Sequence, residues 1–60
     1  MYKIEIKNLK TGKTHEMAAS VDPSREKEDV AEAARWQMIN VHGLQPGEWQ
    51  VLSYEPIPTL

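Results

Sequence analysis

Hydrophobic and charged residues alternate at the start of the chain. Tyr2, Ile4 and Ile6 are separated by charged residues, and this period of two is typical of a strand with one buried face. The pattern predicts a strand at about residues 2–8 with its apolar side chains toward the core.

A turn and a second strand follow. The segment Lys10-Thr11-Gly12-Lys13 suits a short hairpin, because Gly12 can adopt a positive φ without a steric penalty. The chain is then expected to return as a strand at about residues 13–19. The inward positions of this strand are expected to be His15, Met17 and Ala19.

The middle of the chain carries the signals of one long helix. Asp22 is a good N-cap, and Pro23 suits the first helical position because its missing N–H would have no intrahelical partner there. Gly43 is placed to end the helix, and Leu44 to make the apolar contact that accompanies such a cap. We expect the helix at about residues 23–42.

A third strand is expected at about residues 48–55. Pro46 and Gly47 occupy the central positions of a type II turn before it. Pro56 ends the strand and leaves an extended tail at 56–60.

The expected element order is β-β-α-β, which predicts a single α+β domain. Because the helix carries the chain back across the sheet, the third strand runs antiparallel to the first. The simplest arrangement is a three-stranded antiparallel sheet of order 2-1-3, with the helix packed on one face. A two-stranded sheet with the third strand elsewhere is the alternative.

Composition limits the class of protein. The chain has 60 residues and no Cys, so its core is marginal and neither disulfides nor thiolate zinc sites can support it. Self-association into a homodimer is therefore expected. No apolar run reaches the roughly 20 residues that span a bilayer, and no signal-peptide pattern is visible. We expect a cytoplasmic protein with no membrane partner.

Little in the sequence could carry catalysis. His15 and His42 fall on different predicted elements, and no third residue has the spacing of a metal site. The serines lack the context of a nucleophile, and each glycine serves a turn or a cap rather than a phosphate loop. We expect neither an enzyme nor a bound metal or cofactor.

The predicted helix has a second, smaller apolar side. On a wheel of 100° per residue, Trp36 and Ile39 lie opposite the main stripe, although a helix on a small sheet needs only one apolar face. Because Trp is enriched at binding hot spots, we expect these two residues to contact a partner or a second copy. In the alternative, Trp36 is buried, either because the helix is rotated about its axis or because the C-terminal tail folds over it. The main stripe toward the sheet is expected to be Val30, Ala31, Ala33, Ala34, Met38 and Val41.

The third strand breaks the period-two pattern. If Trp49 and Val51 face the helix, then Leu52 and Tyr54 line the open face of the sheet with Gln50 and extend the protein interface. A β-bulge near Leu52 is the alternative, and it would turn Leu52 or Tyr54 inward.

Lysines gather in the N-terminal hairpin. Lys3 and Lys7 are expected to point outward from the first strand, and Lys10 and Lys13 flank the turn. A Lys-rich β-ribbon can contact phosphates, so the alternative function is a small nucleic-acid-binding module. The net charge of −2 and the scarcity of stacking aromatics count against it.

Three segments share a general style with a known group of proteins. They are the hairpin Lys10-Thr11-Gly12-Lys13, the strand end Glu16-Met17-Ala18-Ala19-Ser20 and the strand Gly47-Glu48-Trp49-Gln50-Val51. In this style the chain resembles the small accessory proteins of bacteriophages and prophages, including some anti-CRISPR proteins. The resemblance implies a non-catalytic protein-interaction module, an inhibitor that occupies the surface of a bacterial protein complex in the host cytoplasm. It assigns no residues.

Overall fold

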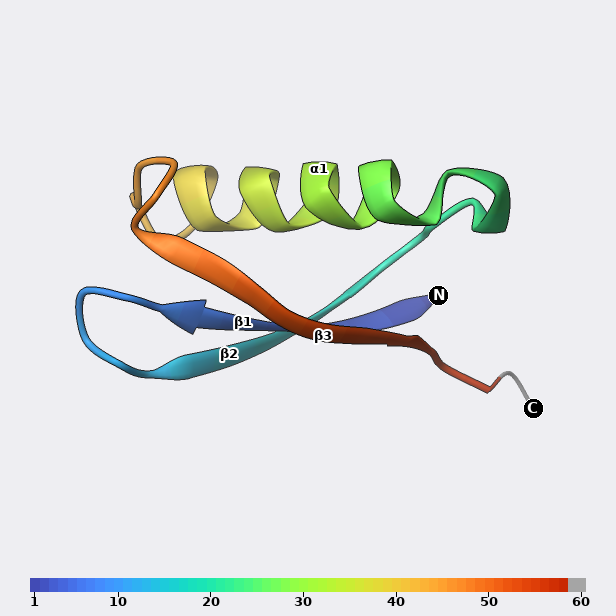
Figure 1. The fold of residues 1–60 in the computed structure, drawn as a ribbon, viewed down its shortest axis with the longest axis horizontal. Coiled ribbons are helices and arrows are strands. Elements are labelled where there is room, and N and C mark those ends of the chain that lie inside the picture. Colours follow the sequence, from blue (N-terminus) through green and yellow to red (C-terminus); the bar gives the residue numbers. More distant parts are fainter. Residues whose placement is uncertain (59–60) are drawn as a thin grey trace.

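The chain forms a three-stranded sheet with one helix across one of its faces. A computed structural model describes residues 1–58. Figure 1 shows the helix as one layer and the sheet as the other. The elements are β1 (Tyr2–Asn8), β2 (Thr14–Ala19), a 3-10 turn η1 (Pro23–Arg25), α1 (Glu26–Asn40) and β3 (Trp49–Pro56).

The sheet has the expected topology. Its strand order is β2-β1-β3, and both outer strands run antiparallel to β1. The α+β prediction with a sheet of order 2-1-3 is therefore confirmed, and the two-stranded alternative is wrong.

The alternation of β1 places the core. Tyr2, Ile4 and Ile6 are all buried, and neither isoleucine exposes any of its surface. Burial of an aliphatic side chain of this size contributes about 1.5–3 kcal/mol. Their partners across the β1–β2 ladder are half-buried on the same face, as the alternation predicts. These partners are Ala19, Met17 and His15.

The α-helix is shorter than the predicted 23–42. Asp22 does cap the segment, since its carboxylate accepts a hydrogen bond of 2.9 Å from the Ser24 N–H. Arg25, however, leaves helical geometry at φ −132° and ψ 38°, so the first turn is 3-10 and α1 begins at Glu26. At the other end the last helical hydrogen bond runs from the Val41 N–H to the Gln37 carbonyl.

The helix ends because the chain reverses at Gly43, whose φ is +68°. This reversal buries Leu44, and the Leu44 N–H donates to the Met38 carbonyl at 2.9 Å. Val41 is the C-cap of α1, and its side chain is exposed.

The buried stripe of α1 is narrower than predicted. Val30, Ala34 and Met38 are buried at intervals of four residues, and Ala33 is half-buried. Ala31 is exposed, because the sheet of three strands covers only a narrow strip of the helix. The placement of Ala31 and Val41 in the stripe was wrong.

A β-bulge in β3 resolves the broken pattern of that strand. Ser53 lies opposite Glu5 and Val51 opposite Ile6, so Leu52 has no partner on β1. An extra residue changes the parity of the strand, and Tyr54 therefore lies opposite Ile4 on the helix side. The placement of Tyr54 on the open face is wrong, and the bulge alternative is confirmed.

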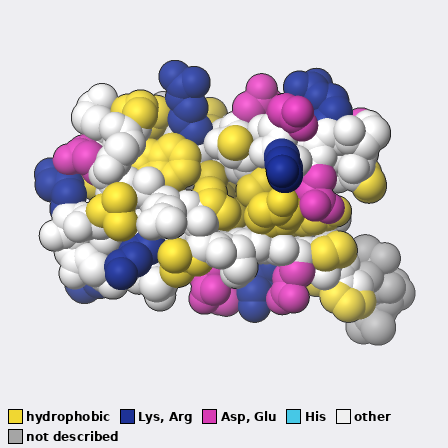
Figure 2. Space-filling model, in the orientation of Figure 1, with side chains coloured by type: hydrophobic (Ala, Val, Ile, Leu, Met, Phe, Trp, Pro, Cys, Tyr) yellow, Lys and Arg dark blue, Asp and Glu magenta, His cyan; other side chains and the backbone are white. Residues whose placement is uncertain are grey.

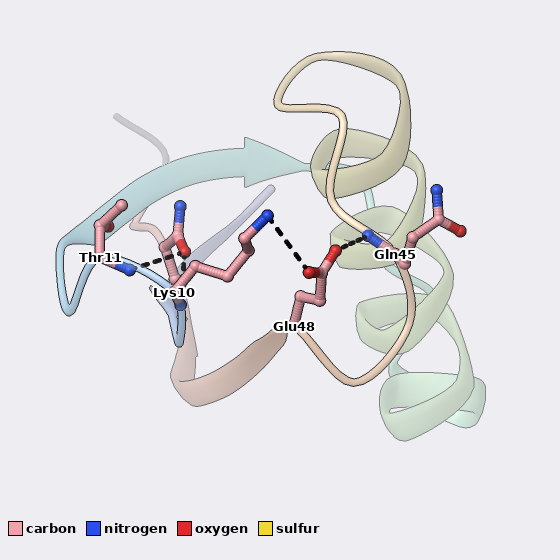
Figure 3. A network of polar contacts seen from close by, with 5 residues as sticks. Lys10, Thr11, Gln45 and Glu48 are labelled. Atoms are coloured by element: carbon pink, nitrogen blue, oxygen red, sulfur yellow. Dashed lines mark hydrogen bonds and ion pairs between the residues drawn. The ribbon is translucent and has the colours of Figure 1, made fainter.

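The loop before β3 is tied to the hairpin. Gly47 has φ +94°, and the Glu48 N–H donates to the Gln45 carbonyl at 3.0 Å, as in a type II turn. The Glu48 carboxylate accepts from the Gln45 N–H at 2.7 Å and pairs with the Lys10 ammonium at 3.4 Å (Figure 3).

The end of the chain continues the sheet instead of folding over the helix. Pro56 belongs to β3, and the Ile57 N–H donates to the Met1 carbonyl at 2.9 Å. The predicted tail 56–60 thus begins later than expected, and positions 59–60 lie outside the described residues. The idea that the tail covers Trp36 is wrong.

Hydrophobic side chains follow the seam between the two layers in Figure 2, with charged groups above and below them. Within residues 1–58, α1 and η1 lack the length and apolar character that a membrane crossing requires.

Candidate protein-interaction surface

Trp36 projects from the outer side of α1. It is two residues from both Ala34 and Met38, which face the sheet, and a step of two residues rotates a side chain by about 200°. Trp36 is 62% exposed, more than any other large hydrophobic residue among the described positions. The sequence-based placement of Trp36 away from the core agrees with this geometry.

A shallow hollow of about 320 Å³ lies beside Trp36. One helix alone forms its walls, so it cannot surround a small molecule as ligand pockets usually do. Its size and openness suit a single large side chain of a partner protein. The lining residues are Glu32, Arg35, Trp36, Ile39 and Asn40.

The rim of the hollow carries one charge of each sign. Glu32 and Arg35 lie three positions apart on α1, and neither forms an ion pair with another residue in the range 1–58. The side-chain amide of Asn40 donates to the Trp36 carbonyl at 3.0 Å. An apolar centre with a polar rim is the usual anatomy of a protein–protein interface.

The four predicted interface residues do not form one surface. Trp36 and Ile39 line the same hollow. Tyr54 instead packs against the core, with its ring 6.4 Å from that of Tyr2. Leu52 is exposed at the bulge of β3. The candidate surface therefore consists of the outer face of α1, defined by the five lining residues of the hollow.

The lysines of the hairpin are partly neutralised. Lys3 lies between Glu16 at 3.3 Å and Glu55 at 3.7 Å, and hydrogen bonding to Glu16, followed by the charge of that carboxylate, raises the Lys3 pKa. Lys10 pairs with Glu48. Lys7 and Lys13 have no ion pair among the described residues. This arrangement offers no continuous basic strip for a phosphate backbone, and no observation favours the nucleic-acid alternative.

His15 and His42 lie in contact, although the sequence predicted them only on different elements. Their ring centroids are 4.4 Å apart with planes tilted by 38°. The topology explains the contact, because β2 starts and α1 ends at the same end of the molecule (Figure 1). Within residues 1–58 no group of three or more His, Cys, Asp or Glu side chains could hold a metal.

No protein-family model matches the chain, and no curated protein or solved structure matches it either. The function must therefore be inferred from the geometry of the outer face of α1.

Proposed function

We propose that this chain is a non-catalytic protein-interaction module that binds through the outer face of α1. The observation that carries the proposal is the 62% exposure of Trp36 beside a hollow lined by its own helix. The core cluster takes Val30, Ala34 and Met38 from α1 and does not include Trp36. Trp and Arg are the residues most enriched at binding hot spots, and here Arg35 and Trp36 are adjacent.

The finer proposal follows from the resemblance to phage accessory proteins. In it, the chain inhibits a bacterial protein complex by occupying part of its surface. A module with one exposed aromatic anchor supports this role, because such an anchor needs only one matching pocket on the target.

Capture from bacterial lysate tests the proposal. Tagged wild-type protein is compared with Trp36→Ala and with Val41→Ala, which removes an exposed apolar side chain that does not line the hollow. Both changes are at exposed positions, and we expect the free energy of unfolding to stay within about 0.5 kcal/mol of wild type.

We expect quantitative mass spectrometry to show proteins that wild type and Val41→Ala both capture and that Trp36→Ala captures at least about tenfold less, as for a hot-spot residue. Equal capture by all three proteins, with folding verified by circular dichroism, would remove the outer face of α1 as a surface that binds a bacterial protein.

A further inference from the structure

The outer face of α1 combines a projection and a hollow. Trp36 stands out from the helix, and the hollow beside it is lined by Glu32 and Arg35 on its N-terminal side and by Ile39 and Asn40 on its C-terminal side. A two-fold contact is isologous, so each subunit uses the same patch. A second copy of the chain therefore brings a Trp side chain to this hollow while its own hollow receives Trp36.

The charges at the rim are self-complementary. Glu32 and Arg35 have opposite signs and form no ion pair within the described residues. Helices related by a two-fold axis perpendicular to them run antiparallel. When the axis crosses α1 between the levels of Glu32 and Trp36, Glu32 of one copy lies close to Arg35 of the other, and the reciprocal pair forms on the other side of the axis. Identical neighbouring charges would repel in the same arrangement.

We propose that the occupant of this surface is a second copy of the chain, in a two-fold dimer with antiparallel α1 helices and Trp36 near the axis. The proposal rests on the proposed function, because it names a partner for the same surface. A competing two-fold dimer would join two β3 edges into a six-stranded sheet. The bulge at Leu52 disfavours it, because bulges bend an edge strand and interrupt regular pairing.

The size of the surface predicts a weak dimer. α1 has 15 residues, which corresponds to a length of about 22 Å. One face of such a helix covers less than the roughly 800 Å² per partner of a standard stable interface. We therefore expect a Kd on the order of 10 μM, and a monomer–dimer equilibrium that dilution shifts.

Charge exchange tests the dimer directly. Glu32→Arg leaves two positive charges at the rim and Arg35→Glu leaves two negative ones. We expect sedimentation equilibrium to show wild type rising from 6.9 kDa toward twice that mass between about 1 and 500 μM. Each charge variant alone should associate at least tenfold more weakly. An equimolar mixture of the two should recover wild-type association, which a merely destabilising substitution could not produce.

Trp36→Ala is expected to remain monomeric, whereas Val41→Ala should associate like wild type. A wild-type mass of 6.9 kDa at 500 μM overturns the dimer, as does a mixture of charge variants that fails to associate. A monomeric wild type whose lysate capture still depends on Trp36 would reject self-pairing and keep the interaction module. A dimer whose lysate capture does not depend on Trp36 would keep self-pairing and reject the inhibitor role.

Discussion

At the scale of single residues, two carboxylates organise the connections between elements. Asp22 caps the start of η1, and the Ser24 N–H lowers the pKa of Asp22. Glu48 accepts from the Gln45 N–H, which is the main reason that its pKa is lowered, and the charge of Lys10 adds to the effect. The cap at Asp22 could be predicted because its partner is two residues away. The Lys10 partner of Glu48 could not, because 38 positions separate them.

Replacing Glu48 by Gln tests the role of its charge. The folded-state pKa of Glu48 lies below its ordinary value of 4.5, so its contribution to stability is complete above that pH and is lost as pH falls through the lower folded-state value. We expect Glu48→Gln to lower the free energy of unfolding at pH 7, and the difference from wild type to shrink below pH 4.5. Urea denaturation between pH 7 and pH 2.5 measures this.

Lys10→Gln is the matched control for Glu48→Gln. It removes only the lesser cause of the pKa shift and should therefore have the smaller effect at pH 7. A difference between wild type and Glu48→Gln that stays constant over the whole pH range would contradict the assignment.

At the scale of elements, β3 is the strand whose buried face could not be predicted from hydrophobic alternation alone. Apolar residues occur at 49, 51, 52 and 54. Neither the odd-numbered nor the even-numbered positions alone include all four, so a period of two does not identify the buried face. The register depends on which residues of β1 face them, and this pairing is set by Ile4 and Ile6 in the core. The regular strands β1 and β2 could be predicted because each needs only its own alternation.

Deletion of Leu52 tests the bulge. Without Leu52, positions 49, 51 and 54 of the present numbering still face the helix, and Ser53 still lies opposite Glu5. We expect the deletion variant to keep its fold and a free energy of unfolding within about 1 kcal/mol of wild type. Circular dichroism and urea denaturation provide the measurement.

Deletion of Glu5 is the control. It removes one residue from the regular central strand and turns either Ile4 or Ile6 away from the core. The loss of one buried Ile costs about 2–5 kcal/mol, enough to unfold a domain of this size. If deleting Leu52 unfolds the chain as completely as deleting Glu5, Leu52 is not a removable extra residue, and the register of β3 against β1 is wrong.

At the scale of the whole molecule, the sequence predicted the order of elements and the outward position of Trp36. Both follow from local patterns, namely strand alternation, helix caps and the helical wheel. The separation of Tyr54 from Trp36 and the contact between His15 and His42 could not be predicted in the same way. They depend on how the helix lies across the sheet, and on which ends of the elements meet.

The central claim is that the chain uses one Trp for binding and the other for its fold. Trp36 is exposed on the outer face of α1, whereas Trp49 packs half-buried against the core. The two indole N–H groups give separate signals in a ¹H–¹⁵N spectrum, assigned with Trp36→Phe. We expect the Trp36 indole signal to shift progressively as the protein is concentrated from 10 to 500 μM, while the Trp49 signal stays in place. A stationary Trp36 signal together with a moving Trp49 signal would contradict the assignment of the binding surface to α1.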